Sequence, residues 1–236
     1  MSASNLNKPI NRLLAALPTE DYQRLFPYLQ PVKLPQHQIL YHAGEDYDYA
    51  YFPFHAIVST VAIMENGSTT EIGIIGNEGM VGLPIILNTG YTNSTAIVQV
   101  SGDGYRVAAE RLQEELNRQG ALKHLLMRYI QARFIQLGQT AACNRYHTLE
   151  QRFARWLLSV RDNIQQNEFQ LTQEFISQML GVRRTGVSEV AAKFQQAGII
   201  QYKRGLIRIV SPQRLEAATC ECYELIYREF DRLLNF

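Results

Sequence analysis

The sequence lacks positive charge over a long N-terminal stretch and lacks cysteine before residue 143. No lysine or arginine occurs between Lys33 and Arg106, so a phosphate buried in that segment would find no cation from the segment itself. The absence of cysteine from the first 142 residues excludes an iron–sulfur cluster held there by thiolates. No apolar run approaches the roughly 18 residues of a membrane span, and no charged-then-apolar leader is present. We therefore expect a soluble, cytoplasmic protein with no membrane partner.

Cysteine is scarce in the remainder of the chain as well. The three cysteines are Cys143, Cys220 and Cys222. An odd number without CxxC spacing argues against a disulfide framework or a zinc knuckle. We interpret them as free thiols and expect no metal site and no cofactor. No catalytic set of residues stands out either, so we do not expect an enzyme.

Charge is divided unevenly along the chain. Residues 1–105 carry four Lys/Arg against nine Asp/Glu, a net charge of −5, whereas residues 106–236 carry nineteen against thirteen, a net charge of +6. A chain of 236 residues can form two modest domains, each with its own core. The two halves are therefore expected to have different partners.

Residues 169–210 have the pattern of a helix-turn-helix followed by a hairpin. Thr172 precedes a short apolar-periodic run and can cap a first helix, which Gly181 ends. Four apolar residues then recur at offsets 0, 3, 4 and 7, which places them on one face of a second helix. They are Val187, Val190, Ala191 and Phe194.

The opposite face of this second helix and the hairpin tip are polar and basic. The window holds six Lys/Arg and two Glu, a net charge of +4, although the whole chain is only +1. Such a helix can enter a major groove while a basic hairpin contacts the backbone, although an ordinary helical corner shares the pattern. The predicted DNA-binding residues are Thr172, Arg183, Arg184, Thr185, Ser188, Glu189, Lys193, Lys203 and Arg204.

The N-terminal half predicts many short strands. A helical segment broken by Pro18 and Pro27 covers residues 10–29. Apolar runs with a period of two then alternate with turns, which is typical of a β-sandwich or roll. The expected strands are 38–41, 50–52, 57–63, 70–75 and 94–100.

A long uninterrupted helix is predicted over residues 121–144. One apolar stripe steps by 3 and 4 residues, as a coiled-coil seam does. Burial inside a single domain would produce the same pattern. The seam residues are Met127, Ile130, Phe134, Leu137 and Ala141, and a second stripe of Leu122, Leu125, Leu126 and Tyr129 could pack on the roll.

These segments, in this order, resemble the Crp/Fnr family of bacterial transcription regulators. The resemblance rests on the winged helix-turn-helix pattern of residues 171–210, on the preceding helix that starts HTLEQRFARWLL at residue 147, and on the roll. It implies an α+β chain with a cyclic-nucleotide-binding-type β-roll (double-stranded β-helix) over 1–120, a dimerisation helix over 121–145 and a winged helix-turn-helix over 146–236. It also implies a homodimer on a palindromic double-stranded DNA operator, with RNA polymerase as a further partner.

The roll departs from the nucleotide-binding members of that family at two positions. In those members a glutamate for the ribose follows a glycine-rich helix start, and an arginine for the cyclic phosphate comes about a dozen residues later. Leu83 and Ser94 occupy these positions here. The resemblance thus implies the fold of the family but not its usual binding of cAMP. The effector is unknown. The candidate effector-pocket residues are Glu71, Gly73, Gly82, Leu83, Ser94, Thr95 and Arg128.

Two other functions remain open for the roll. His37, His42 and Glu45 could bind a metal in a cupin-like enzyme, although their spacing does not match the cupin HxH pattern. Alternatively, the roll could bind no small molecule and act as a protein-interaction module.

Overall fold

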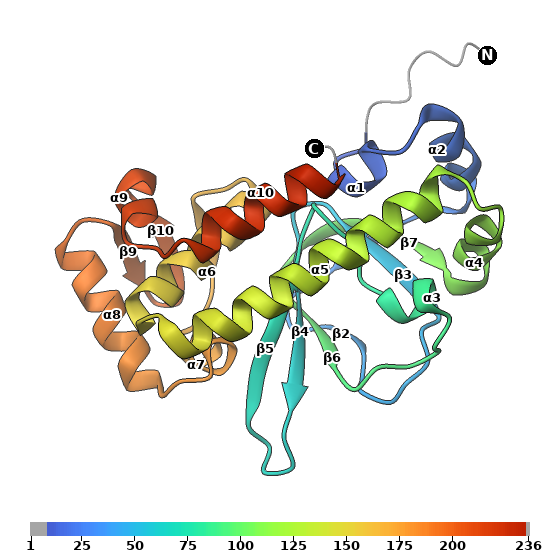
Figure 1. Cartoon of the computed structure of the whole chain (residues 1–236). Coiled ribbons are helices and arrows are strands. Elements are labelled where there is room, and N and C mark those ends of the chain that lie inside the picture. Colours follow the sequence, from blue (N-terminus) through green and yellow to red (C-terminus); the bar gives the residue numbers. More distant parts are fainter. Residues whose placement is uncertain (1–8, 235–236) are drawn as a thin grey trace.

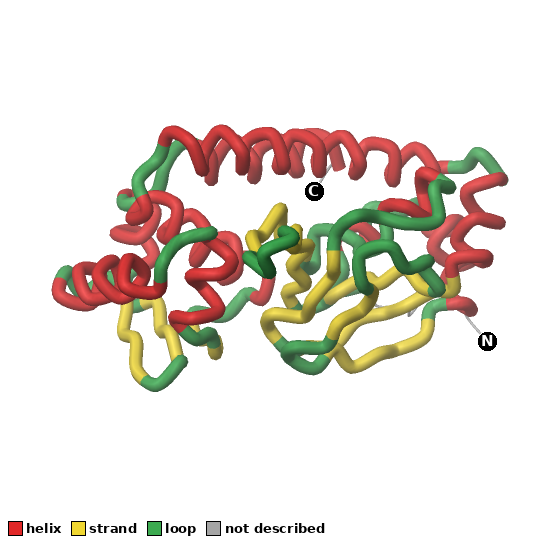
Figure 2. Tube along the Cα trace, turned by 90° about the horizontal axis from the view of Figure 1, so that it is seen from below, coloured by secondary structure: helices red, strands yellow, loops and turns green. Residues whose placement is uncertain are grey.

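One helix of 26 residues, α5 (Ala121–Tyr146), runs along most of the molecule and connects its two parts (Figure 1). The computed structural model describes residues 9–234. Strands predominate in the part before α5, and helices predominate in the part after it (Figure 2). Residues 1–8 and 235–236, at the outer ends of the expected domains 1–120 and 146–236, lie outside the described residues.

The N-terminal part is the predicted roll, built from two antiparallel sheets. Its sheets have the strand orders β1-β7-β3 and β2-β6-β4-β5. All five expected strands are present, whereas β1 and β7 were not predicted. The strands are β1 (Gln30–Leu34), β2 (Ile39–Tyr41), β3 (Tyr49–Pro53), β4 (Ile57–Ile63), β5 (Thr69–Ile75), β6 (Thr95–Val100) and β7 (Gly102–Ala108).

Short helices flank the roll, and one stripe of α5 completes its core. The flanking elements are α1 (Arg12–Ala15), α2 (Thr19–Leu25), η1 (Phe26–Tyr28), α3 (Leu83–Leu87) and α4 (Ala109–Asn117). The stripe of Leu122, Leu125, Leu126 and Tyr129 is buried in the roll core, as the sequence predicted. The Tyr129 hydroxyl donates a hydrogen bond of 2.9 Å to the carbonyl of Met80, which satisfies the one polar atom of this ring. This packing fixes α5 on the roll.

The C-terminal part forms a second core around a three-stranded sheet of order β8-β10-β9. Thr148 and Gln151 form a capping box that starts its first helix directly after α5. The elements are α6 (Leu149–Ile164), β8 (Glu168–Gln170), α7 (Gln173–Leu180), α8 (Arg184–Gln196), β9 (Ile200–Lys203), β10 (Leu206–Ile209), α9 (Pro212–Ala217) and α10 (Cys222–Leu234).

The last helix, α10, runs back along α5 toward the roll (Figure 1). Phe230 and Leu234 are buried in the roll core, and Asp231 forms an ion pair of 2.9 Å with Arg12 of α1. The second core in turn includes Ile57 and Val61 of β4. Both parts are thus packed against each other as well as against α5. None of the helices within residues 9–234 is long and apolar enough to cross a membrane.

Candidate nucleic-acid interface

The first helix of the predicted helix-turn-helix begins and ends where the sequence indicated. The Thr172 hydroxyl accepts a hydrogen bond from the backbone N–H of Phe175 and so caps α7. Gly181 closes the helix in the left-handed conformation, with φ of 62°. The backbone N–H of Gly181 donates hydrogen bonds to the carbonyls of Ser177 and Gln178. The sharp turn into the next helix therefore leaves this N–H with hydrogen-bond partners.

The second helix, α8, buries the predicted apolar face and exposes a polar one. Its buried residues are Val187, Val190, Ala191 and Phe194. Arg183 is its N-cap and Arg184 its first residue, and both side chains are exposed together with Thr185 and Glu189. The helix therefore presents two guanidinium groups at its N-terminal end, the end that enters a major groove in helix-turn-helix proteins.

The predicted hairpin is present and has a two-residue turn. Leu206 pairs with Lys203 in the β9–β10 ladder, which leaves Arg204 and Gly205 as the loop. Both have positive φ, 51° for Arg204 and 82° for Gly205, as a type I′ turn requires. Lys203 and Arg204 are exposed at the tip. Strand β8 pairs with β10 and widens the wing to three strands, which the sequence did not predict.

A groove lies between the start of α8 and the wing. Arg184 and Arg204 line it from its two sides, with Thr172 and Glu174 at the start of α7 and Tyr202 of β9. The hydroxyl of Tyr202 donates a hydrogen bond of 2.6 Å to the carbonyl of Leu171, so this ring is fixed against the residue that precedes the cap of α7. The structure therefore brings Arg184 of the helix and Arg204 of the wing to one surface.

Besides Thr172, two more of the predicted DNA-binding residues have partners within the chain. The Ser188 hydroxyl donates a hydrogen bond of 2.6 Å to the side-chain amide oxygen of Gln173. Lys193 forms an ion pair with Glu150 at the start of α6. Gln173 was not singled out in the sequence, because its position one residue after the cap does not distinguish it from other first-turn residues.

The β4–β5 hairpin of the roll reaches the helix-turn-helix. Met64 and Ser68 of this hairpin line one cleft together with Arg183 and Arg184. A side chain at Gly181 would come within 3.1 Å of the Thr70 hydroxyl oxygen. The roll and the start of α8 are therefore in close proximity in this arrangement.

The predicted seam of α5 is divided between exposed and buried residues. Met127 and Phe134 are 46% and 65% exposed, and Ala141 is also exposed. These three residues are seven apart, so they follow one line along the helix. Ile130 is 7% exposed and Leu137 is half-buried, so these two residues are largely covered within the protomer.

Four of the predicted effector-pocket residues are on or near α3 and β6. Gly82 has φ of 118° and precedes α3, whose first residue is Leu83. Ser94 is 9% exposed and its hydroxyl is 3.1 Å from that of Thr92. The Thr95 hydroxyl accepts a hydrogen bond from the N–H of Ala43. The side chains at the ribose and phosphate positions are therefore uncharged, and both hydroxyls have partners.

Glu71 and Gly73 of β5 have a different environment. Glu71 accepts hydrogen bonds from Ser59, Gln99 and Trp156, none of which belongs to the predicted pocket. Gly73 lies beside the guanidinium of Arg133, which donates a hydrogen bond of 2.5 Å to the carbonyl of Ile74.

Arg128, which was chosen for the pocket, is exposed on α5. Arg133 is instead the arginine of α5 that is buried, with 2% exposure. It also contacts the side-chain oxygen of Gln136, one turn further along the helix. This guanidinium is therefore directed at β5 and held there by two acceptors.

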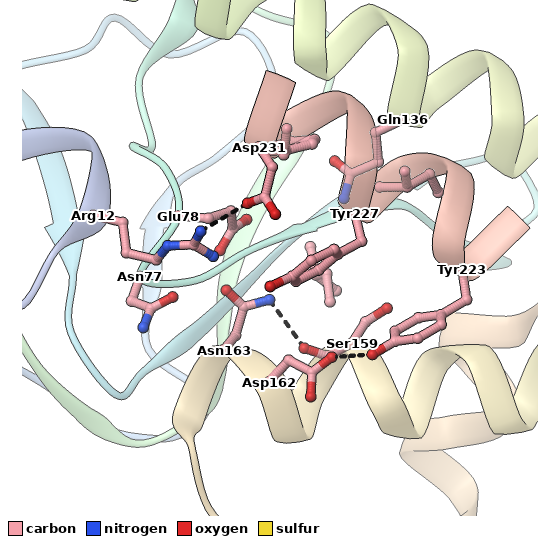
Figure 3. Close-up of a pocket in the computed structure, with 13 residues that line it drawn as sticks. Arg12, Asn77, Glu78, Gln136, Ser159, Asp162, Asn163, Tyr223, Tyr227 and Asp231 are labelled. Atoms are coloured by element: carbon pink, nitrogen blue, oxygen red, sulfur yellow. Dashed lines mark hydrogen bonds and ion pairs between the residues drawn. The ribbon is translucent and has the colours of Figure 1, made fainter. Parts of the chain in front are cut away.

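A small cavity lies where the roll, α6 and α10 meet (Figure 3). Arg12 and Asp231 bridge one side of it, and the Tyr223 hydroxyl donates to Asp162 on the other. Burial raises the pKa of Glu78, which lines the cavity beside Asn77. The volume is about 70 Å³. Since pockets for small ligands measure about 300–1,000 Å³, this cavity does not fit a nucleotide.

The residues of the cupin-like alternative do not form a metal-binding set in the described part of the chain. Glu45 accepts a hydrogen bond of 2.8 Å from the backbone N–H of His42, so it caps its own turn. The His37 ring packs edge-on against Phe175, with 6.1 Å between ring centroids. His37 therefore belongs to the contact between the roll and α7.

Two family models match the chain. Residues 31–119 match the cyclic nucleotide-binding domain, and residues 151–218 match the Crp-like helix-turn-helix domain. Together the two models cover most of the chain. No curated protein matches the sequence.

Solved structures of similar fold include several regulators. A putative transcriptional regulator of the crp/fnr family from Eubacterium rectale is 20% identical, covers 87% of this chain and 96% of its own, and has a TM-score of 0.65. FixK2 from Bradyrhizobium japonicum is 15% identical over 81% of this chain and 98% of its own, with a TM-score of 0.69. The c-di-GMP-responsive global regulator CLP from Xanthomonas campestris is 14% identical over 82% of this chain and 100% of its own, with a TM-score of 0.62.

The order of the two matched domains, the long helix between them and the winged helix-turn-helix agree with one another. The chain belongs to the Crp/Fnr family of transcription regulators, with a cyclic-nucleotide-binding-type roll and a helix-turn-helix DNA-binding domain.

Proposed function

We propose that the chain acts as a homodimer that binds a palindromic operator and that its roll does not bind cAMP in the usual way. The observation that supports the dimer most strongly is the exposed line of Met127, Phe134 and Ala141 on α5. Exposed apolar side chains at a seven-residue spacing are typical of a helix that pairs with a second copy of itself.

The proposed DNA contacts involve the polar side chains of α8 and of the wing tip. Arg184, Thr185, Ser188 and Glu189 are proposed to face base edges, because side chains on this face of α8 can reach into the major groove. Lys203 and Arg204 at the wing tip are proposed to contact phosphates. Binding to a chromosomal operator implies action in the cytoplasm, and contact with RNA polymerase is part of the same proposal.

The roll has no cation at the position that would bind a cyclic phosphate, and this supports the proposal that it does not bind cAMP in the usual way. Leu83 and Ser94 offer neither a carboxylate for a ribose nor a guanidinium for a cyclic phosphate. The guanidinium of Arg133 in α5 donates hydrogen bonds to the carbonyl of Ile74 in β5 and to the side chain of Gln136. The roll could then respond to another effector or transmit a protein contact to α5.

Selection from random double-stranded DNA tests the dimer and the operator together. The purified chain should enrich a motif with two-fold symmetry whose half-sites are about 34–36 Å apart, one helical turn of DNA. A motif with a single half-site would contradict the dimer, and the absence of any enriched motif would contradict sequence-specific binding.

A further inference from the structure

The joint between α5 and α6 contains a group of metal-ligand side chains that the sequence pattern did not reveal. Cys143 lies in the last turn of α5, and His147 is the residue that caps this helix. Cys222 is the first residue of α10, and Cys220 lies two residues before it. We call these four residues the cysteine–histidine cluster.

The ligand atoms of the cysteine–histidine cluster converge. One ligand atom from each residue can be chosen so that all four lie within 4.8 Å of one another. The Sγ atoms of Cys143 and Cys220 are 3.6 Å apart, and Sγ of Cys222 is 3.5 Å from Nδ1 of His147. Two thiolates of a tetrahedral zinc site, each about 2.3 Å from the ion, are about 3.8 Å apart, and a thiolate and an imidazole nitrogen are about 3.6 Å apart. The observed separations are therefore close to two edges of that tetrahedron.

Backbone structure holds the ligands in pairs. The N–H of His147 donates a hydrogen bond of 3.1 Å to the carbonyl of Cys143, which keeps these residues one helical turn apart. The N–H of Tyr223 donates to the carbonyl of Cys220 in the turn that starts α10. Each pair thus comes from a hydrogen-bonded helix terminus, and the packing of α10 on α5 brings the two pairs together.

The surrounding side chains support the ligands in the way metal sites require. The Nε2 atom of His147 lies 3.2 Å from a carboxylate oxygen of Glu221, while Nδ1 is directed at Cys222. A histidine ligand commonly donates its second nitrogen to a carboxylate, which fixes the tautomer and orients the ring. The side-chain amide of Gln139 donates a hydrogen bond of 3.1 Å to Sγ of Cys222.

Charge and burial also fit a metal–thiolate centre. The three cysteines have 0–5% exposure. Arg152 and Arg155 of α6 are close enough for their charges to interact with Cys143. Their Nε donors are buried and have no hydrogen-bond partner among the described residues. Three thiolates and one Zn²⁺ carry a net charge of −1, which these guanidinium groups would balance.

From this arrangement we propose that the cysteine–histidine cluster binds a single Zn²⁺ ion in a closed, structural site. Four protein ligands of this type complete a tetrahedral coordination sphere and leave no position for a substrate. The proposal replaces the expectation, drawn from the cysteine spacing alone, of free thiols and no metal.

Two other chemistries fit the cluster less well. The ligands of an iron–sulfur cluster surround two or four iron atoms and their bridging sulfides, and so are spread more widely than these four ligand atoms, which all lie within 4.8 Å of one another. A disulfide between Cys143 and Cys220 would leave the third thiol, the oriented histidine and the Gln139 contact without a role.

Metal binding at the cysteine–histidine cluster would fix the positions of three helix ends relative to one another. The ion would tie the end of α5 to the start of α10, directly beside the capped start of α6. On the proposed function, it would set the direction in which each DNA-binding domain leaves the dimer helix. The metal site itself requires neither a dimer nor DNA, so its test can fail while the proposed function stands.

Metal analysis of the unaltered chain tests the site directly. The chain is produced without a histidine tag in zinc-supplemented cells and purified under reducing conditions without chelator. We expect about one zinc per chain. The chain from cobalt-grown cells should show the visible bands of tetrahedral Co²⁺ and thiolate-to-cobalt charge transfer. A reduced chain with neither bound zinc nor a cobalt spectrum would overturn the proposal, as would a Cys143–Cys220 disulfide found in place of the metal.

Variants assign the ligands. Cys220→Ser and His147→Gln should release the metal to a competing chelator, while His124→Gln, on an exposed position of α5, should retain it. Glu221→Gln should lower zinc affinity by about 10–100-fold, because the carboxylate only orients His147. Full zinc content in Cys220→Ser would show that the ion binds elsewhere and overturn the assignment. If that variant does not fold, the cobalt spectrum of the unaltered chain decides.

Discussion

The indole nitrogen of Trp156 donates a hydrogen bond of 3.1 Å to Oε1 of Glu71, and this bond joins the DNA-binding domain to the roll. The other carboxylate oxygen of Glu71 accepts from the hydroxyl of Ser59 and from the side-chain amide of Gln99. Burial nevertheless raises the pKa of Glu71 to about 7, because loss of solvent outweighs the hydrogen bonds from Ser59 and Trp156 and the nearby charges of two arginines. The charge at this domain contact therefore changes near neutral pH.

We predict that Glu71 makes stability depend on pH between about 4.5 and 7. The folded chain holds the Glu71 proton more tightly than the unfolded chain, so the contribution of this group to the free energy of unfolding is full below about 4.5. It is lost as the pH rises through about 7. Glu71→Gln should therefore flatten this part of the profile when denaturant unfolding is measured over a pH series. Glu65→Gln, at an exposed position before β5, is the control. Identical slopes for Glu71→Gln and the unaltered chain would contradict the prediction.

Local signals in the sequence predicted the DNA-binding elements well. Thr172 caps α7 and Gly181 ends it, because capping and left-handed turns depend on a few adjacent residues. The period of the apolar residues predicted α8 and most strands of the roll. Strand β8 was missed because three residues, Glu168–Gln170, are too few to show a period.

Features that depend on contacts between distant segments could not be predicted. Cys143 and Cys220 are 77 residues apart, and only the return of α10 along α5 brings their sulfur atoms within 3.6 Å. The four-residue spacing of Cys143 and His147 at the end of one helix was the available sequence signal for a metal site, but it identifies only two of the four ligands. Arg133 was likewise indistinguishable from Arg128 until the rotation of α5 against the roll was known.

Arg184 is predicted to read a base at the start of the recognition helix. Arg184→Ala should cost about 1–3 kcal/mol at a matched operator and relax the preference at one base pair. Arg228→Ala removes an exposed arginine of α10 and should leave binding unchanged. The measurement is competition binding to the selected operator and to its single-base variants. Equal affinity of Arg184→Ala and the unaltered chain across these duplexes would remove Arg184 from the base contacts.

The wing tip is predicted to bind phosphate without reading sequence. Replacing Lys203 and Arg204 by glutamine should reduce the slope of log K against log salt by about 0.9 for each lost phosphate contact. Specific and random duplexes should be affected alike. Lys33→Gln is the matched control, because Lys33 is an exposed cation of the roll that pairs with Asp103. An unaltered slope in the double variant would place the wing outside the DNA interface.

The exposed line on α5 is predicted to be the dimer seam. Phe134→Glu would bury an unpaired carboxylate against the second copy, and it should abolish both dimerisation and binding to the palindromic operator. Asn117→Glu adds the same charge at an exposed position at the end of α4 and should leave the dimer intact. Sedimentation measures the outcome. A stable Phe134→Glu dimer would show that another surface pairs the protomers.

Cyclic AMP is predicted to bind poorly to the roll. Leu83 and Ser94 supply no charge at the ribose and phosphate positions, and the segment between Lys33 and Arg106 supplies no cation at all. Each missing charge-assisted hydrogen bond is worth about 1.5–3 kcal/mol, so affinity should fall by one to several orders of magnitude relative to an intact pocket.

Calorimetric titration of the chain with cAMP, followed by operator binding in its presence, measures this prediction. Arg133 is the arginine of α5 that could compensate, but it would have to leave the carbonyl of Ile74 and the side chain of Gln136 to reach a nucleotide. Each of those contacts would then be lost from a buried guanidinium, which opposes the movement. Binding at micromolar or tighter affinity that also strengthens DNA binding would contradict the prediction. In that case Arg133→Gln should abolish the binding while Arg128→Gln, at an exposed position of the same helix, should not.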